Sequence, residues 1–275
     1  MMFEILLFSL VCLCALVVLV CRFLMPEISK RQLEPWYLDY ARSFLPVLLL
    51  VFLLRGFVAE PFRIPSGSML PTLEIGDFIL VNKFNYGLRL PILHTKVLSI
   101  NEPERGDVVV FRYPPNPSQN YIKRLIGVPG DEVVYNNQTL YVNGEKVESV
   151  AMDDYIQEGK TTPQNRFEQT LTTGAEDGSS VAFSTLLNKY SSRSANAGSW
   201  TVPEGHYFMM GDNRYNSADS RSRSFTYVPD ENIVGEAFFV WLSFGTANGD
   251  SWLFDIDFER IGADIKAREV NAQGN

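Results

Sequence analysis

Two long apolar runs open the chain, and short runs of alternating character follow them. The first run, Ile5 to Leu24, is interrupted near its end by Arg22. The second run, Ser43 to Ala59, carries Arg55 close to its end. Each run is long enough to cross a hydrocarbon core of roughly 30 Å as a helix, and Arg55 can extend its charged end to the lipid–water interface. The pattern predicts two membrane-spanning helices.

The first apolar run has a competing interpretation as a secretory signal peptide that is removed. A signal peptide begins with basic residues and ends at a cleavage site flanked by small residues. No Lys or Arg precedes this run, it is long for a signal peptide, and no small-x-small site follows Arg22. These features favour an anchor that stays in the protein.

The segment between the two runs is polar and basic. With Arg22 at its edge, it carries Lys30, Arg31 and Arg42, whereas the N-terminal flank has no basic residue. Loops rich in Lys and Arg remain in the cytoplasm. We therefore expect a cytoplasmic loop, with the N-terminus and everything after Ala59 on the outer face. In a bacterium with two membranes that face is the periplasm.

Beyond the second run the chain has the character of a β domain. Short runs rich in β-branched residues and bounded by Gly, Pro or Asn indicate strands at Phe78–Val81, Asp107–Phe111 and Glu132–Tyr135. Residues Thr139–Val147 contain an Asn-Gly turn, which is typical of a hairpin. Ala237–Leu242 is continuously apolar and predicts a buried strand. We expect an all-β domain of coiled, partly closed antiparallel sheets.

One later stretch, Glu148 to Ser199, is rich in Ser, Thr, Asn, Gly and Glu and has weak periodicity. It predicts a polar inserted subdomain, and the polar tail after Gly262 predicts a short, frayed helix. The expected units are a first span (1–24), a cytoplasmic loop (25–42), a second span (43–59), a β domain (60–147 and 200–262), the inserted subdomain (148–199) and a tail (263–275).

Composition narrows the classes of function. The formal net charge of −8 and the pI near 4.9 argue against a nucleic-acid-binding protein, which would present a basic face. All three cysteines lie in the first apolar run, so the outer domain has no disulfide framework and no cysteine-based metal site. The only histidines, His94 and His206, are too few for a zinc site built on several histidines. We expect no metal and no cofactor. A Ser-His-Asp triad would need one of these histidines, and neither lies in a recognisable triad motif.

A proline-flanked serine pair is the first of three segments with concentrated chemistry. Ser66 and Ser68 lie on either side of Gly67, between Pro65 and Pro71. The prolines disfavour a helix and the glycine permits close backbone approach. The segment therefore predicts a stiff loop that presents a small hydroxyl, although an ordinary surface turn has the same composition.

The other two segments hold unusual densities of charge. Lys123 and Arg124 are adjacent in a strand-like run, so alternation should point one of them into the domain. Burial disfavours the charged form of a lysine, so a buried one needs a reason. The alternative is that both are edge-strand charges in water. Gly211 to Arg221 packs charged, amide and hydroxyl groups together, which predicts either a hydrogen-bonded platform or a solvated loop.

Four segments together resemble the bacterial type I signal peptidases of the two-span, Gram-negative kind. Phe62–Leu73 is similar to the family's nucleophile segment and Arg105–Phe111 to the strand segment that follows it. Tyr121–Asp131 is similar to the lysine segment and Gly211–Arg221 to the last signature. Each motif is weak alone. All four in order, behind two spans, are highly specific.

The resemblance implies a membrane-bound serine endopeptidase that removes N-terminal signal peptides from exported precursors after a small-x-small site. It implies a Ser-Lys dyad, with Ser68 as nucleophile and Lys123 as general base. A lysine that acts as a base near neutrality needs its pKa lowered by about 2–3 units. The Ser66 hydroxyl and the Ser68 backbone N–H are the implied oxyanion donors.

Further residues take supporting and binding roles by the same resemblance. Ser217 would hold the Lys123 amine, and Asp219 and Arg221 would pair to brace that loop. The precursor would bind as an added strand beside Ser66 and Tyr121. Small substrate side chains would be selected by pockets lined by Phe62, Ile64, Pro65, Met69, Leu73, Ile79, Val110, Tyr121 and Ile122.

The resemblance also implies a location and partners. The location is the bacterial inner membrane, with the catalytic domain in the periplasm. The partners are precursors that carry signal peptides, membrane phospholipid and the export translocon, and no nucleic acid. The aromatic residues Trp241, Phe244, Trp252 and Phe254 are either core residues or contacts with the outer leaflet.

Two other classes of function remain as alternatives. A Ser-Lys acyl enzyme of the penicillin-binding class needs Ser-x-x-Lys on a helix, and no lysine stands at that spacing after Ser68. A membrane-tethered peptide-binding or assembly protein of the same fold would bind precursors without turnover. The presence of both Ser68 and Lys123 favours the enzyme, and cleavage of a labelled precursor separates the two.

Overall fold

The computed structural model places most of the chain. It describes residues 2–23, 35–91, 95–157, 161–174, 179–187, 197–244, 256–263 and 265–270. The expected cytoplasmic loop lies mainly outside these residues. So do His94, Trp252 and Phe254.

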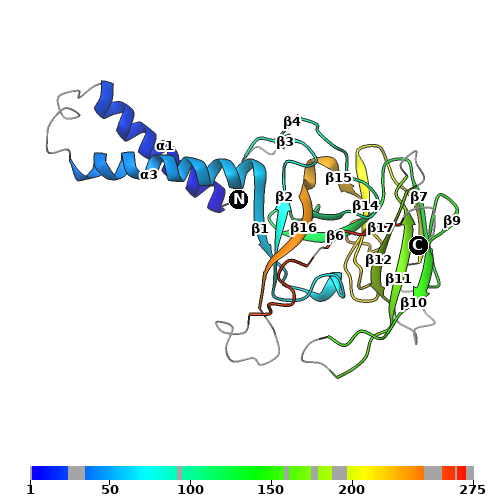
Figure 1. Cartoon of the computed structure of the whole chain (residues 1–275). Coiled ribbons are helices and arrows are strands. Elements are labelled where there is room, and N and C mark those ends of the chain that lie inside the picture. The colour runs from blue at the N-terminus through cyan, green and yellow to red at the C-terminus, as the bar shows by residue number, and fades with distance from the viewer. Residues whose placement is uncertain are drawn as a thin grey trace.

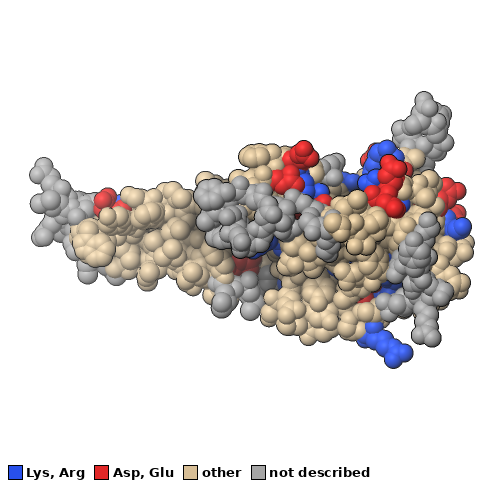
Figure 2. All heavy atoms as spheres, turned by 90° about the horizontal axis from the view of Figure 1, so that it is seen from below, with Lys and Arg blue, Asp and Glu red and all other residues tan. Residues whose placement is uncertain are grey.

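Two apolar helices form an arm that extends from the β domain (Figure 1). Helix α1 spans Met2–Phe23, and α3 spans Trp36–Leu53 before a π-helical turn, η1, at Leu54–Val58. The helices lie side by side, with the rings of Phe8 and Phe52 5.6 Å apart. Both are long and apolar enough to cross a membrane. On the face that Figure 2 shows, the arm carries few charged side chains and most of them lie on the β domain.

The second helix begins earlier than the hydrophobic pattern predicted. It starts at Trp36 rather than Ser43, because the mixed polar and apolar residues before Ser43 continue the helix. Pro35 precedes it and accepts the backbone N–H of Leu38 at 2.9 Å. Leu38 and Ala41 are buried, so the first part of the helix also makes packing contacts. The hydropathy pattern located the apolar segment of the helix but not the residue at which the helix begins.

A curled, seven-stranded antiparallel sheet forms the centre of the β domain, in the order β1-β2-β16-β5-β6-β14-β15. Two of the predicted β-branched strands lie in it as β2 and β5, and the apolar run from Ala237 becomes part of the long strand β16. Its strands are β1 Ala59–Arg63, β2 Asp77–Asn82, β5 Val108–Arg112, β6 Asn120–Gly127, β14 His206–Met210, β15 Val228–Pro229 and β16 Ile233–Ser243.

Smaller antiparallel sheets flank the central one. The predicted Asn-Gly hairpin is confirmed, with Asn143 and Gly144 both at positive φ. One four-stranded sheet contains β13 Gly198–Thr201, β7 Glu132–Asn136, β8 Thr139–Val142 and β9 Glu145–Lys146. Another contains β10 Glu148–Ala151, β11 Arg166–Thr172, β12 Ser180–Leu186 and β17 Arg268–Val270. A separate hairpin consists of β3 Leu88–Arg89 and β4 Lys96–Leu98.

The tail differs from its prediction. Instead of a short helix, Arg268–Val270 forms strand β17, which pairs with Ser180–Ala182 of β12. A short isolated helix is marginal in water, whereas the edge of β12 offers unpaired backbone groups. The pairing joins segments far apart in the chain, so no local pattern could reveal it.

The described part of residues 148–199 is more than a polar appendage. Leu171, Val181 and Phe183 are buried in one hydrophobic cluster with Ile126 and Phe208 of the central sheet. This segment therefore covers one face of β6. Two other hydrophobic clusters pack against the remaining side chains of β6. The boundaries at 148 and 199 stay a prediction. Because both faces of β6 are covered, both of its charged residues, Lys123 and Arg124, are buried.

Candidate active site

A tight turn presents Ser68 at the end of strand β1. Ser66 is extended and exposed, and a single 3-10 turn, Gly67–Met69, follows it. Ser68 itself is only 8% exposed. Its carbonyl accepts the backbone N–H of Asn213 at 3.1 Å, and the Gly67 carbonyl accepts the Asn213 side-chain amide at 2.9 Å. The serine loop is therefore held by the third of the polar segments.

Strand β6 brings Lys123 to the same point. Its Nζ lies 2.5 Å from the Ser68 Oγ and 2.8 Å from the carbonyl oxygen of its neighbour Ile122. The side chain is 4% exposed, and Nζ lies 5.7 Å from the centre of the Tyr121 ring. A neutral amine at hydrogen-bond distance from a hydroxyl can accept its proton. The structure thus brings the predicted nucleophile and base into contact.

The surroundings of Lys123 favour the neutral amine. Burial, the largest influence, lowers the pKa of Lys123 to about 8, because removal from water penalises the ammonium form. The carboxylates of Asp219 and Asp212 oppose this effect, and the charge of Arg221 adds to it. A substantial fraction of the amine is therefore unprotonated slightly above neutral pH.

The third segment forms a hydrogen-bonded platform beneath the dyad. The Arg221 guanidinium donates two hydrogen bonds to the Asp219 carboxylate, at 2.9 and 2.8 Å, and the backbone N–H of Gly211 donates to Asp219 at 3.0 Å. Burial raises the pKa of the Asp219 carboxyl, but the charge and hydrogen bonds of Arg221 outweigh it and hold that pKa below its usual value. The predicted pair is thus ionised and buried.

Gly211 allows the platform to approach the serine loop. A Cβ atom at this position would lie 2.3 Å from the Ser217 Oγ and 2.5 Å from the Ser68 carbonyl oxygen. Any side chain would therefore push Ser217 or Ser68 away. Within the described chain, Lys123 hydrogen-bonds to Ser68 and Ile122 and not to Ser217. A role for Ser217 in holding the amine stays a prediction.

The structure adds a buried ion pair that the sequence did not reveal. Arg124 is fully buried beside Lys123, although strand alternation predicted only one of the two inside. Its guanidinium forms bonds of 2.8 and 2.7 Å to Asp212 and lies 4.3 Å from the Phe183 ring. Thr72 donates to Asp212 at 2.6 Å. Through these bonds the Arg124–Asp212 pair joins the serine loop, the lysine strand and the platform.

A second buried arginine was also missed. Arg214 is 4% exposed, and its Nε donates to the Gly211 carbonyl at 3.2 Å. Burial lowers the pKa of its guanidinium to about 10. Its carbonyl accepts a bond of 2.9 Å from Arg221. The only sign of this buried arginine in the sequence was the high density of charge after Gly211. A solvated loop would have the same density of charge.

Most of the residues predicted to bind substrate gather near Ser68. Tyr121 packs in a neighbouring aromatic cluster with Phe111 and Phe225, and its ring also lies 5.7 Å from the Lys123 Nζ. Pro65 is exposed beside Ser66. One hydrophobic cluster contains Ile64, Met69, Leu73, Ile79, Val110 and Ile122, with Phe62 packed against it.

Comparison with known proteins shows the family of the chain. Residues 37–242 match the family described as "Signal peptidase, peptidase S26", a range that contains all four motif segments. The signal peptidase I of Pseudomonas fluorescens is 48% identical over 225 residues, which cover 78% of this chain and 76% of the relative. That of Haemophilus influenzae is 34% identical over 286 residues, covering 87% and 80%.

A second Pseudomonas relative and a solved structure complete the comparison. The signal peptidase I of Pseudomonas aeruginosa is 48% identical over 227 residues, covering 78% of this chain and 76% of the relative. The crystal structure of a signal peptidase I from Enterococcus faecalis has 31% sequence identity and a TM-score of 0.30, covering 50% of this chain and 98% of that one. With its two membrane-capable helices and its curled antiparallel sheet, the chain belongs to the signal peptidase family, peptidase S26, and is a membrane-anchored peptidase that cleaves signal peptides.

Proposed function

We propose that the protein cleaves its precursors with a Ser-Lys dyad formed by Ser68 and Lys123. The observation that carries this proposal is the 2.5 Å contact between the buried Nζ and the Oγ. Neutral Lys123 takes the proton as Oγ attacks the scissile carbonyl carbon. The oxyanion that forms is stabilised by the Ser68 N–H and the Ser66 hydroxyl.

The remaining steps follow from the same two groups. As the tetrahedral intermediate collapses, the Lys123 ammonium returns its proton to the leaving nitrogen, and the carbonyl carbon stays bound to the Ser68 oxygen as an ester. Lys123, neutral again, then takes a proton from the water that attacks this ester. The second collapse breaks the bond to Oγ, which takes the proton back from the Lys123 ammonium, and the signal peptide leaves as a carboxylic acid that loses its proton to solvent.

Two free strand edges support an extended mode of binding. Among the described strands β1 pairs only with β2, so its outer edge is left unpaired by them. Strand β6 pairs with β14 from Arg124 onward, which leaves the edge of Asn120–Lys123 open on that side. An extended precursor segment can add as a strand between them. Ile64 and Ile122 share a hydrophobic cluster with Met69, the residue after Ser68, and we infer that they restrict the substrate pocket to small side chains.

The arrangement of the helices supports the proposed orientation. In Figure 1 the N-terminus of α1 and the end of α3 both lie at the β domain, so the helix ends that flank the basic segment in the sequence lie away from it. With that loop in the cytoplasm, the site faces the periplasm from the inner membrane. Membrane phospholipid and the export translocon are then its neighbours.

The preference for small side chains can be tested with a precursor that carries an Ala-x-Ala site. We expect replacement of either alanine by Leu to reduce kcat/KM by about 100-fold or more, because the pocket must exclude the added methylenes. Leu at the middle position is the matched control, and we expect little change there. Equal cleavage of all four precursors would contradict the proposed selectivity. Tight binding without any cleavage would favour the peptide-binding alternative.

The pH dependence of cleavage tests the state of Lys123. Only the neutral amine acts as a base, so kcat/KM should rise about tenfold per pH unit on the acid side and level off above pH 8, the approximate pKa of Lys123. Thermal unfolding measured over the same pH range controls for loss of the fold. A rate that stayed constant from about pH 6 to 9 would argue against a lysine base with this pKa.

A further inference from the structure

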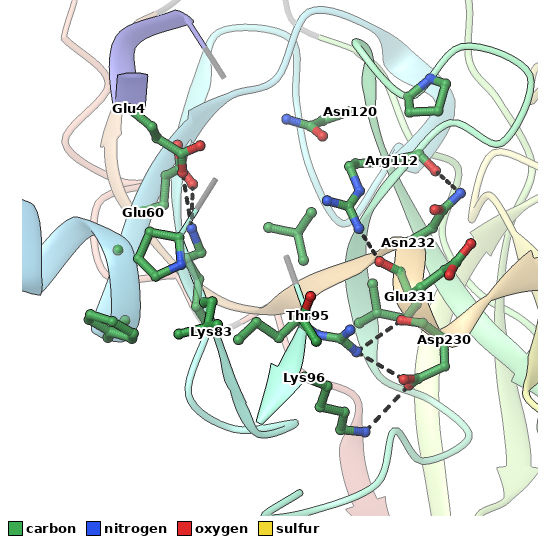
Figure 3. A pocket seen from close by; sticks show the side chains of 18 of the residues that line it. Glu4, Glu60, Lys83, Thr95, Lys96, Arg112, Asn120, Asp230, Glu231 and Asn232 are labelled. Atoms are coloured by element: carbon green, nitrogen blue, oxygen red, sulfur yellow. Dashed lines mark hydrogen bonds and ion pairs between the residues drawn. The ribbon is translucent and has the colours of Figure 1, made fainter. Parts of the chain in front are cut away.

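A cluster of charged side chains lies where the helical arm meets the β domain (Figure 3). Lys83, just after strand β2, is at its centre. Its Nζ lies 3.4 Å from an oxygen of Glu4 in α1, 3.2 Å from an oxygen of Glu60 in β1 and 3.5 Å from the Arg55 carbonyl in η1. One ammonium therefore contacts the first helix, the end of the second helix and the central sheet.

Neighbouring contacts strengthen this junction. Arg55 donates to the second oxygen of Glu60 at 2.9 Å, and its guanidinium lies 4.3 Å from the centre of the Phe3 ring. The side chains of Lys83, Glu4 and Glu60 are 14%, 10% and 12% exposed. Charges this far removed from solvent are screened less by salt than surface charges. The cluster is thus a firm connection between the anchor and the domain.

The cluster is separate from the catalytic groups but lies beside the path to them. It forms one wall of a cavity of about 660 Å³ whose lining includes Gly56 at the end of the arm, Phe62 of β1 and Asn120 of β6. The chain runs from the arm through β1 directly to the Ser68 turn. A precursor segment that passes from the bilayer to Ser68 must follow the same direction.

We infer that Lys83 is a positioning residue, which fixes the catalytic domain on its anchor and thereby sets the distance from the bilayer at which a precursor is cut. This inference rests on the proposed function. The apolar segment of a signal peptide is held in the membrane, so the substrate fixes the height of each of its peptide bonds. The anchor fixes the height of Ser68. A firm junction selects one bond among neighbours, whereas a loose one does not.

The experiment uses the full chain in phospholipid vesicles and a precursor with two Ala-x-Ala sites. The second site lies about three residues, or roughly 10 Å of extended chain, further from the apolar segment. We expect wild type to cut at one site and Lys83→Met to cut at both. For Lys83→Met acting on the membrane-inserted precursor, kcat/KM should fall about tenfold. This is less than the roughly hundredfold loss that misplacement of a reacting group can cause. Cleavage of a short water-soluble peptide should be unchanged. Glu4→Gln should reproduce this pattern, and the double variant should add little.

Two matched variants separate positioning from general effects. Lys96→Met removes a lysine from the same cavity, but this lysine pairs with Asp230 at 3.5 Å inside the β domain, so wild-type site choice is expected. Lys83→Arg keeps the charge and should keep the choice of site. Unchanged site choice in Lys83→Met would overturn the inference, and so would equal losses on precursor and short peptide. Failure of the proposed dyad would look different, because Lys123→Met would then cut both substrates at close to the wild-type rate.

Discussion

Replacement of Ser68 by Ala, or of Lys123 by Met, is expected to lower kcat for precursor cleavage by roughly 10⁶-fold. Ser68→Ala removes the atom that attacks the carbonyl carbon. Lys123→Met removes the only amine within hydrogen-bond distance of that atom in the described chain and leaves an apolar side chain of similar length. Because the two groups act as a unit, the double variant should lose no more than either single one. Cleavage of a labelled precursor at saturating enzyme measures the effect.

The controls for this prediction come from the same chain. Lys146→Met removes an exposed lysine in β9 and should leave cleavage unchanged. Ser66→Ala should reduce kcat by only about 10²–10³-fold, the effect of losing one oxyanion donor. If Lys123→Met cut at close to the wild-type rate with its fold intact, the base would be wrongly assigned. His94 and His206 would then become candidates again.

Replacement of Arg124 by Met is expected to lower the free energy of unfolding by about 3–5 kcal/mol. The substitution leaves the Asp212 carboxylate buried without the cation that forms two hydrogen bonds with it. The loss should show as a lower denaturant midpoint for the β domain. Activity should fall as well, because the pair joins the strand of Lys123 to the platform and, through Thr72, to the serine loop.

A compensating change and a surface pair test this second prediction. Replacing Asp212 by Leu in the Arg124→Met background removes both charges and should recover part of the stability. Arg268→Met breaks an exposed pair with Glu168 and should change stability by less than about 1 kcal/mol. A loss for Arg124→Met as small as for Arg268→Met would show that the buried pair is not needed for stability.

Local patterns in the sequence predicted much of this architecture. The apolar runs located both helices, β-branched runs located β2, β5 and β7, and the Asn-Gly pair located its hairpin. Each of these features depends on residues close together in the chain. Resemblance to a family supplied the pairing of Ser68 with Lys123, which lie 55 positions apart. No pattern in the residues alone could have supplied it.

The remaining features depend on contacts between distant segments. Strand alternation assumes one face in the core and one in water, but Phe183 of β12 covers the second face of β6 and encloses Arg124 there. Strand β17 needs the edge of β12 as a partner. In the sequence, Glu4 indicated only that the N-terminal flank is not basic. Its contact with Lys83 joins residues 79 positions apart, so no local pattern could predict it.

The described end of the chain has a practical consequence for fragment design. Ile265, 1% exposed, packs in the same hydrophobic cluster as Ile64 and Met69, the neighbours of the nucleophile. A few residues later β17 closes the edge of β12. A fragment that stops at Gly262 would thus open a hole beneath the serine turn and leave a bare strand edge, which is a template for aggregation. Expression boundaries are therefore better trimmed at the helical arm than after Gly262.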